Sequence, residues 1–292
     1  MLVELVQAKT PDGLRLDGSL ALSATSPESP PPFDAAILLH GVGGSFFGGA
    51  MFEPLTSRLL ELGVSALRVN TRGYGAVSMI ATDGGVTRGG AAFEVVDQCR
   101  HDIKAWCDFL VTRDMCRIGL IGHSLGAIKA IYATAHAPHS NITRVIAASP
   151  PRLSHDAFQL GPRSRDFFES LATAKQLVKE GHPEQLFTAR FPFPLLISAA
   201  SYVDKYGDER YNFVKFASRV AVPTLYLYGS VELEQGGIAF AGLPDAIRQA
   251  VAHEEDVDGK QVEIAIIPGA DHFYTGKYSE LTAVIADWLV RE

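Results

Sequence analysis

The sequence predicts an α/β fold in which helices cover a mostly parallel sheet. Short, nearly continuous apolar runs alternate with longer amphipathic stretches along most of the 292 residues, a pattern typical of parallel strands that are buried on both faces. Parallel strands need long crossovers, and the amphipathic stretches can supply them as helices. Hydrophobic residues make up 47% of the chain and charged residues 20%, so the composition supports a large core.

The predicted strands and helices follow one another in a regular order. Two alternating runs, at about 2–9 and 14–22, flank a Pro-Asp-Gly turn signal and predict a hairpin. A Ser/Pro-rich loop at 26–32 is expected on the surface. Further strands are expected at 35–40, 65–70, 117–121, 144–148, 224–228 and 262–267. Helices are expected at about 51–62, 91–111, 125–136, 237–252 and 278–291.

One segment interrupts this order. Residues 151–219 are rich in phenylalanine and tyrosine, and they have helical stretches but no clear strand. An aromatic-rich insertion between two strands of a parallel sheet suggests a helical cap over the carboxyl edge of the sheet. Residues 1–150 and 220–292 would then form the α/β core. An extra helical layer with ordinary aromatic packing is the alternative interpretation.

Charge and cysteine content exclude several classes of protein. A net charge of -7 argues against a nucleic-acid partner, which requires a basic surface, and against an anionic membrane surface. No stretch approaches the ~20 apolar residues of a membrane span, and the N-terminus lacks the features of a signal peptide, so we expect a cytoplasmic protein. We expect neither a metal nor a cofactor, because no zinc-like or disulfide pattern includes the cysteines at 99, 107 and 116.

A nucleophile motif lies between a predicted strand and a predicted helix. The pentapeptide Gly122-His123-Ser124-Leu125-Gly126 has the form G-x-S-x-G, and its position matches the strand-to-helix turn that this motif requires. Small residues must flank a serine on such a turn to avoid backbone clashes. The start of the helix then directs free N–H groups at charge that develops beside the serine. We therefore predict that Ser124 is a nucleophile.

A serine hydroxyl needs a base, and the best placed of the nine histidines is His272. It follows the last predicted strand in Gly-Ala-Asp-His-Phe, and the carboxyl ends of parallel strands share one edge of the sheet, so this loop can reach Ser124. His40 and His123 also belong to motifs, and we expect them to be structural or to line a pocket.

The third member of a triad is expected on the loop after the strand at 224–228. Glu232 stands three residues after the glycine that ends this strand, and we predict that it orients and stabilises the imidazolium of His272. Glu234 is the nearest alternative. Asp204 and Asp271 are more distant ones.

An oxyanion hole requires two backbone N–H donors. Leu125 directly follows the candidate nucleophile and is expected to supply one of them. The glycine-dense loop His40-Gly41-Val42-Gly43-Gly44 is expected to supply the other, from Val42. A phosphate-binding role for this loop is disfavoured because it lacks both the G-x-G-x-x-G register and a Walker lysine.

These motifs together resemble the α/β-hydrolase superfamily over nearly the whole chain apart from the insertion. The resemblance implies an eight-stranded, mostly parallel sheet with a cap and a Ser-acid-His triad, which maps to Ser124, Glu232 and His272. Many relatives have aspartate where this chain has Glu232. The Tyr202–Gly207 stretch and the turn at 229–232 further resemble a group of bacterial hydrolases.

The expected activity is hydrolysis of an ester-like bond, a carboxylic ester or thioester, in a small and partly apolar substrate. The fold alone does not choose among ester, thioester, amide and carbon–carbon hydrolysis. Three arginines are candidate anchors for a substrate anion, with surface solvation as the alternative role: Arg152, Arg163 and Arg165. A protein that binds or senses a ligand without turnover is the second hypothesis, and cofactor-free peroxidase chemistry is a third. The oligomeric state stays open.

Overall fold

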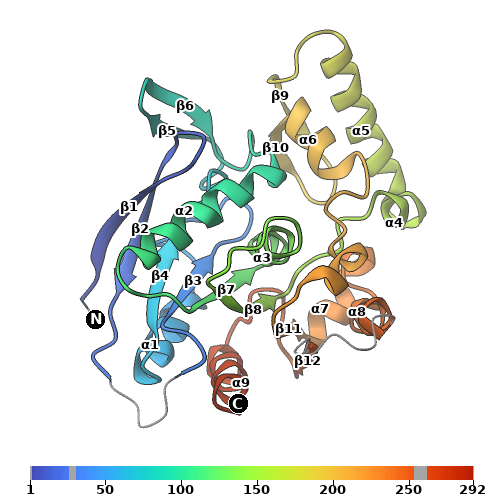
Figure 1. Ribbon diagram of the computed structural model, residues 1–292. Helices are drawn as coiled ribbons and strands as arrows, with labels where there is room; N and C mark the ends of the chain where they lie inside the picture. The colour runs from blue at the N-terminus through green and yellow to red at the C-terminus, as the bar shows by residue number, and fades with distance from the viewer. Residues whose placement is uncertain (1, 26–30, 253–261, 292) are drawn as a thin grey trace.

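Eight strands form one sheet in the order β1-β2-β4-β3-β7-β8-β11-β12 (Figure 1). The structure is a computed structural model and describes residues 2–25, 31–252 and 262–291, so residues 26–30 of the predicted Ser/Pro loop lie outside the described residues. β2 runs antiparallel to both of its neighbours, and all other neighbouring pairs are parallel. The strands are β1 (Glu4–Lys9), β2 (Arg15–Ala21), β3 (Ala35–Leu39), β4 (Ser65–Val69), β7 (Ile118–His123), β8 (Ile142–Ala148), β11 (Thr224–Gly229) and β12 (Val262–Ile267). The predicted mostly parallel, eight-stranded sheet is confirmed.

Helices cover both faces of the sheet, and each face has its own apolar core (Figure 1). Side chains alternate between the faces along β7: Leu120 joins one core and Ile121 the other. The first core includes α2 (Cys99–Val111), α3 (Leu125–His136) and α8 (Leu243–Ala252), and the second includes α1 (Phe52–Glu61) and α9 (Tyr278–Val290). With both faces covered, the carboxyl edge of the sheet is left for the loops that carry polar side chains.

Most predicted elements agree with the structure to within a few residues, but two helices begin later than predicted. The helix expected from residue 91 begins at Cys99, after a 3-10 turn, η1 (Val96–Gln98). The helix expected from residue 237 begins at Leu243, because Gly237 and Gly242 have φ values of 65° and 66°. Only a 3-10 turn, η4 (Gly237–Ala239), forms between these glycines.

Outside the insertion, one hairpin and one short helix were not predicted. β5 (Ser78–Thr82) and β6 (Gly85–Gly89) form a separate hairpin. The six-residue helix α7 (Ser230–Gln235) follows β11 where a loop was expected. Both are too short to show a clear period in the sequence.

The insertion, residues 151–219, contains a strand pair that the sequence prediction missed. β9 (Leu186–Ala189) and β10 (Leu195–Ser198) pair antiparallel, so the expectation of a purely helical segment is wrong. Figure 1 shows its three helices on one side of the molecule, remote from α1 and α9. The other elements are α4 (His155–Leu160), α5 (Ser164–Lys179), α6 (Ala199–Tyr206), η2 (Phe213–Lys215) and η3 (Ala217–Arg219).

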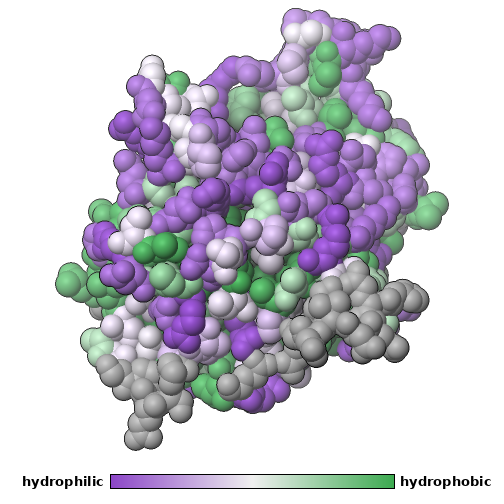
Figure 2. Space-filling model, in the orientation of Figure 1, coloured by the Kyte–Doolittle hydropathy of each residue, from purple (hydrophilic) through white to green (hydrophobic). Residues whose placement is uncertain are grey.

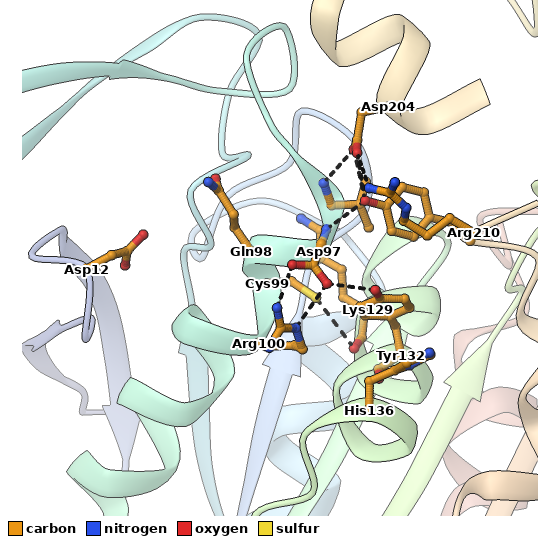
Figure 3. Close-up of polar contacts among 12 residues, drawn as sticks. Asp12, Asp97, Gln98, Cys99, Arg100, Lys129, Tyr132, His136, Asp204 and Arg210 are labelled. Atoms are coloured by element: carbon orange, nitrogen blue, oxygen red, sulfur yellow. Dashed lines mark hydrogen bonds and ion pairs between the residues drawn. The ribbon is translucent and has the colours of Figure 1, made fainter. Parts of the chain in front are cut away.

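The insertion is bonded to the segment that leads into α2. The backbone N–H of Val96 donates to the carboxylate of Asp204 on α6 at 3.1 Å, and that of Asp97 donates to the Tyr211 hydroxyl at 3.0 Å. Figure 3 shows Asp97 with Arg100 and Asp204 with Arg210 in this cluster. The insertion therefore rests on backbone donors that precede α2.

The surface in Figure 2 is mostly hydrophilic, with hydrophobic residues scattered in small groups. Within the described ranges, no helix is long and apolar enough to cross a membrane.

Candidate active site

Ser124 lies on a strained turn between β7 and α3. Its φ and ψ are 56° and -121°, a conformation that L-residues rarely adopt and that persists only when the surroundings enforce it. The flanking glycines permit it: a Cβ at Gly122 would lie 2.2 Å from the Gly126 carbonyl oxygen, and one at Gly126 would lie 2.2 Å from that of Leu39. The motif thus projects the Ser124 hydroxyl from the carboxyl edge of the sheet.

The structure brings His272 and Glu232 to Ser124. His272 Nε2 lies 3.0 Å from Ser124 Oγ, and His272 Nδ1 lies 2.8 Å from Glu232 Oε2. A carboxylate can only accept, so Nδ1 carries the proton and Nε2 is left to accept from the serine hydroxyl. The Glu232 side chain is 2% exposed and that of His272 is 26% exposed. The chain of hydrogen bonds therefore runs from a buried acid to the surface of a cleft.

Glu232 lies on the first turn of α7 and not on a loop. Its Oε1 accepts the backbone N–H of Gly229 at 2.7 Å, as a helix N3 glutamate does when it reaches back to the N-cap residue. This local bond fixes the side chain and turns Oε2 towards His272.

Two buried residues that the sequence analysis did not identify stand behind Glu232. The hydroxyl of Ser149, directly after β8, lies 2.5 Å from Glu232 Oε1 and 2.8 Å from the Tyr274 hydroxyl. Both residues are 0% exposed, with φ values of 51° and 55°. A polar residue at the carboxyl end of a predicted strand was the available signal for Ser149.

The two predicted oxyanion donors flank Ser124. Leu125 begins α3, and Val42 lies in the loop after β3, next to Gly41, where a Cβ would be 3.2 Å from Ser124 Cβ. Neither the Val42 nor the Leu125 backbone N–H donates to any residue that the structure describes. Both amides are therefore unused donors close to the serine.

His40 fixes the orientation of the peptide between Gly41 and Val42. Its Nε2 accepts the backbone N–H of Thr71 at 3.2 Å, so Nδ1 carries the proton and donates to the Gly41 carbonyl at 2.8 Å. The C=O and N–H of a trans peptide point in opposite directions. Anchoring this carbonyl therefore also sets the direction of the Val42 N–H.

Both motif histidines are buried, line the cleft and are neutral at pH 7. Burial, together with the nearby charge of Lys129, lowers the pKa of His40 to about 4. Burial and the nearby His272 lower the pKa of His123 to about 4. His123 Nε2 donates to the His272 carbonyl at 2.7 Å and so holds the loop that carries His272. The predicted structural and pocket-lining positions of His40 and His123 are observed.

A cleft of about 510 Å³ opens at Ser124. No lysine, arginine, aspartate or glutamate lines it within the described part of the chain. Phe193 is its one lining residue from the insertion, and Phe273 faces it from the loop after β12; they are 48% and 64% exposed. The cleft suits a neutral, largely apolar group. The other lining residues are His40, Gly41, Val42, Gly44, Ser45, Gly49, Ala50, Met51, Phe52, His123, Ser124, His272 and Tyr278.

A second buried polar group, which we call the lysine cluster, consists of Glu94, Lys129 and Lys205. All three residues are at most 2% exposed. Lys129 Nζ is in contact with Glu94 Oε1, and Lys205 Nζ lies 3.7 Å from Glu94 Oε2. Lys129 Nζ also donates to Thr71 Oγ1 at 2.9 Å, and Thr71 in turn contacts His40. The lysine cluster therefore connects α6 of the insertion to the loop of Val42.

The lysine cluster is poor in directed hydrogen bonds. Lys129 Nζ contacts Glu94 Oε1 directly, whereas Glu94 Oε2 and Lys205 Nζ have no hydrogen-bond partner among the described residues and lie 3.7 Å apart, so charge alone holds this second pair. Burial raises the pKa of Glu94, but the two ammonium groups outweigh it and the pKa is lowered. Burial lowers the pKa of Lys205, and the attraction of Glu94 offsets this only in part.

The alternative triad acids and the candidate anion anchors do not line the cleft. Glu234 is exposed, Asp204 bonds to the backbone of Val96, and Asp271 accepts the backbone N–H groups of Phe273 and Thr275. Arg163 pairs with Asp166 and Arg165 with Glu169, and neither they nor Arg152 line the cleft. In the described ranges, no three His, Cys, Asp or Glu side chains group as metal ligands.

The strand order and the serine at a strand-to-helix turn define the class of α/β hydrolases. The chain belongs to the α/β hydrolase family: the family model matches residues 36–284. No curated protein matches the chain significantly.

Solved structures share the fold over nearly the whole chain. A ferulic-acid complex of Est1E from Butyrivibrio proteoclasticus is 18% identical with a TM-score of 0.64, and covers 98% of each chain. The esterase Pf2001 of Pyrococcus furiosus is 18% identical with a TM-score of 0.62, and covers 99% of this chain and 91% of its own. The α/β hydrolase GrgF from Penicillium sp. sh18 is 16% identical with a TM-score of 0.65, and covers 100% of this chain and 99% of its own.

Proposed function

We propose that the protein is a serine hydrolase that cleaves an ester-like bond in a small, neutral and partly apolar substrate. The observation that carries this proposal is the hydrogen-bonded chain from Ser124 through His272 to Glu232, which ends in an apolar cleft. One of the proteins with this fold, Pf2001 of Pyrococcus furiosus, is an esterase by name, which agrees with the proposal.

The geometry suits acyl transfer in two steps. His272 Nε2 takes the proton of Ser124 as Oγ attacks the carbonyl carbon, and Glu232 stabilises the imidazolium that forms. The backbone N–H groups of Val42 and Leu125 bind the oxygen that becomes negative. Nε2 then gives its proton to the leaving alcohol or thiol, and an acyl-enzyme remains. Water releases the acid by the same steps and restores the serine.

The insertion, residues 151–219, acts in this proposal as a cap over the cleft. Phe193 supports this, since it reaches the cleft from the loop between β9 and β10. Phe193→Ala is expected to raise KM about 10-fold for aryl esters, the cost of losing part of one aromatic contact. KM for acetate esters of small alkyl alcohols is expected to stay unchanged. An equal change for both esters would contradict the cap role of Phe193.

Covalent labelling tests the nucleophile. A fluorophosphonate probe is expected to label the wild type at Ser124 and to leave Ser124→Ala unlabelled, and the variant is expected to lose hydrolysis of p-nitrophenyl butyrate. Retention of both in Ser124→Ala would overturn the assignment. Tight binding of esters without turnover in the wild type would favour a ligand-binding protein instead.

A matched pair of esters tests the substrate class. None of the described residues that line the cleft is a lysine, arginine, aspartate or glutamate. A butyrate ester is therefore expected to have at least about 100-fold higher kcat/KM than a succinate hemiester of the same alcohol, since the buried carboxylate would lack a partner. Equal rates would show that the acyl group does not enter the cleft.

A further inference from the structure

Three segments that follow strands at the carboxyl edge of the sheet meet in one largely buried ring of polar contacts. Ser149 follows β8, Glu232 follows β11, and both His272 and Tyr274 follow β12. Contacts of 2.5 to 2.8 Å join Tyr274 to Ser149, Ser149 to Glu232, and Glu232 to His272. Tyr274, which contacts Ser149, lies two positions after His272, which contacts Glu232. The backbone from His272 to Tyr274 therefore closes the ring.

When Glu232 is ionised, the two hydroxyl groups in this ring can donate their hydrogen bonds in only one order. A carboxylate has no proton to give, so the Ser149 hydroxyl must donate to Glu232 Oε1. The 2.8 Å contact between Ser149 Oγ and the Tyr274 hydroxyl then requires the tyrosine proton, which is shared with the Leu227 carbonyl at 3.2 Å. The order is therefore Tyr274 to Ser149 to Glu232, in which each hydroxyl strengthens the next bond.

The backbone at both hydroxyl residues is strained. The φ values of Ser149 and Tyr274 are 51° and 55°, and non-glycine residues in this region are uncommon. The backbone N–H of Ser149 donates to the Leu227 carbonyl at 2.8 Å, which fixes the turn. Strain of this kind is found where the surrounding structure must aim a side chain.

We propose that Ser149 is a positioning residue that holds Glu232 Oε1, so that Oε2 stays on His272 Nδ1, and that Tyr274 in turn holds Ser149. This inference rests on the proposed function. Without the Ser149 hydroxyl, only the Gly229 N–H binds Oε1, and the carboxylate can rotate away from the imidazole. Ser149 touches no reacting atom and acts through Glu232 alone.

The test is a double-mutant cycle with Glu232→Ala. Ser149→Ala and Ser149→Gly are both made, because glycine accepts the positive φ and keeps the fold while it removes the hydroxyl. Each is expected to lower kcat about 10- to 100-fold with KM nearly unchanged, as a misaligned catalytic group does. In the Glu232→Ala background, neither change is expected to lower kcat further.

A matched pair of tyrosine variants gives the control. Tyr226 is buried on β11, and its hydroxyl has no hydrogen-bond partner among the described residues. Tyr274→Phe removes the hydroxyl contacts to Ser149 and to the Leu227 carbonyl and is expected to lower kcat by about 3- to 10-fold, less than the loss of Ser149, as the loss of neutral hydrogen bonds would. Tyr226→Phe is expected to leave kcat unchanged.

Proton NMR supplies a readout that needs no turnover. The Nδ1–H of His272, identified by its loss in Glu232→Ala, is expected to shift in Ser149→Ala and Ser149→Gly and to stay in place in Tyr226→Phe. Wild-type kcat in both Ser149 variants, or an equal loss with and without Glu232, would overturn the inference. If the wild type hydrolyses no ester, the proposed function fails by itself, and an unshifted His272 proton then overturns the positioning role.

Discussion

Two buried polar groups lie near Ser124 and are built in opposite ways. In the ring of Ser149, Glu232, His272 and Tyr274, each contact is a short hydrogen bond with a definite donor. In the lysine cluster, one carboxylate meets two ammonium groups, and Glu94 Oε2 and Lys205 Nζ have no hydrogen-bond partner among the described residues. The hydrogen bonds of the ring fix the orientation of its side chains, whereas the lysine cluster is held by the attraction of opposite charges.

Because of this difference, we expect the ring to affect the rate of the reaction and the lysine cluster to affect the stability of the fold. A directed hydrogen bond determines where an acid or a base points, so its loss alters the reaction more than the fold. A buried ion pair has little orientation to lose, but removing one partner leaves an uncompensated charge in the core. Substitutions in the ring should therefore change rates, and substitutions in the lysine cluster should change the free energy of unfolding.

The largest expected effect is on the ring. His272→Ala removes the proposed base and is expected to lower kcat/KM for p-nitrophenyl butyrate by about 10⁵-fold or more. The free energy of unfolding is expected to change by less than about 1 kcal/mol, because the side chain is partly exposed. Kinetics and urea denaturation on the same samples measure both. A rate loss that is explained by unfolding would break the comparison.

The next effect is on the lysine cluster. Glu94→Gln leaves two ammonium groups without a counter-ion and is expected to cost about 3–5 kcal/mol of unfolding free energy, which lowers Tm by roughly 10 °C. The exposed Glu61, paired with Arg58, is the matched control, and Glu61→Gln is expected to cost less than about 0.5 kcal/mol. Equal costs for the two substitutions would show that the lysine cluster does not stabilise the fold.

A third prediction concerns pH. The pKa of His40 is about 4 in the folded protein and ~6.5 in an unfolded chain. The unfolded state therefore binds the proton first as pH falls, and stability that is present above pH ~6.5 is lost towards pH ~4. From pH 7 to 5 the loss through His40 is about 2 kcal/mol.

His40→Asn keeps a donor for the Gly41 carbonyl and removes the titration. It is expected to flatten the pH dependence of unfolding free energy by that amount in urea denaturation. The exposed His182 gives the control His182→Asn, which is expected to leave the slope unchanged. A slope that does not differ between His40→Asn and the wild type would show that His40 is not kept neutral by burial.

The smallest effect is predicted for Lys205. Its ammonium has no hydrogen-bond partner in the described ranges, is partly repelled by Lys129 and lies 3.7 Å from Glu94. Lys205→Met leaves a one-to-one pair of Glu94 and Lys129 and fills the space with an apolar chain, so stability is expected to stay the same or rise by about 1 kcal/mol. A loss as large as that of Glu94→Gln would show that the second lysine is needed.

The two groups also differ in how far the sequence predicted them. Ser124, His272 and Glu232 were identified because each lies just after an apolar strand, and parallel strands bring their carboxyl ends to one edge. That reasoning needs only the order of strands, which long apolar runs show well. Their catalytic roles, like the cap, stay predictions.

The lysine cluster could not be predicted, because its members come from α3, α6 and the segment before η1, and only packing brings them together. A lysine on a helix is solvated in most proteins, so nothing in the sequence marks Lys129 or Lys205 as buried. Helix α7 and the two strands of the insertion were missed for another reason. They are too short for a period, and tertiary contacts fix them.

The hydrogen bonds from the Val96 and Asp97 amides to the insertion also offer an experimental readout of its movement. The backbone amides of these residues donate to side chains of Asp204 and Tyr211 and not to their own secondary structure. Any movement that lifts α6 together with the segment of Tyr211 frees both amide protons for exchange with deuterated solvent, while amides in β7 stay protected by the sheet. Their exchange rates would therefore report how often the insertion separates from the core, independently of unfolding and without an attached label.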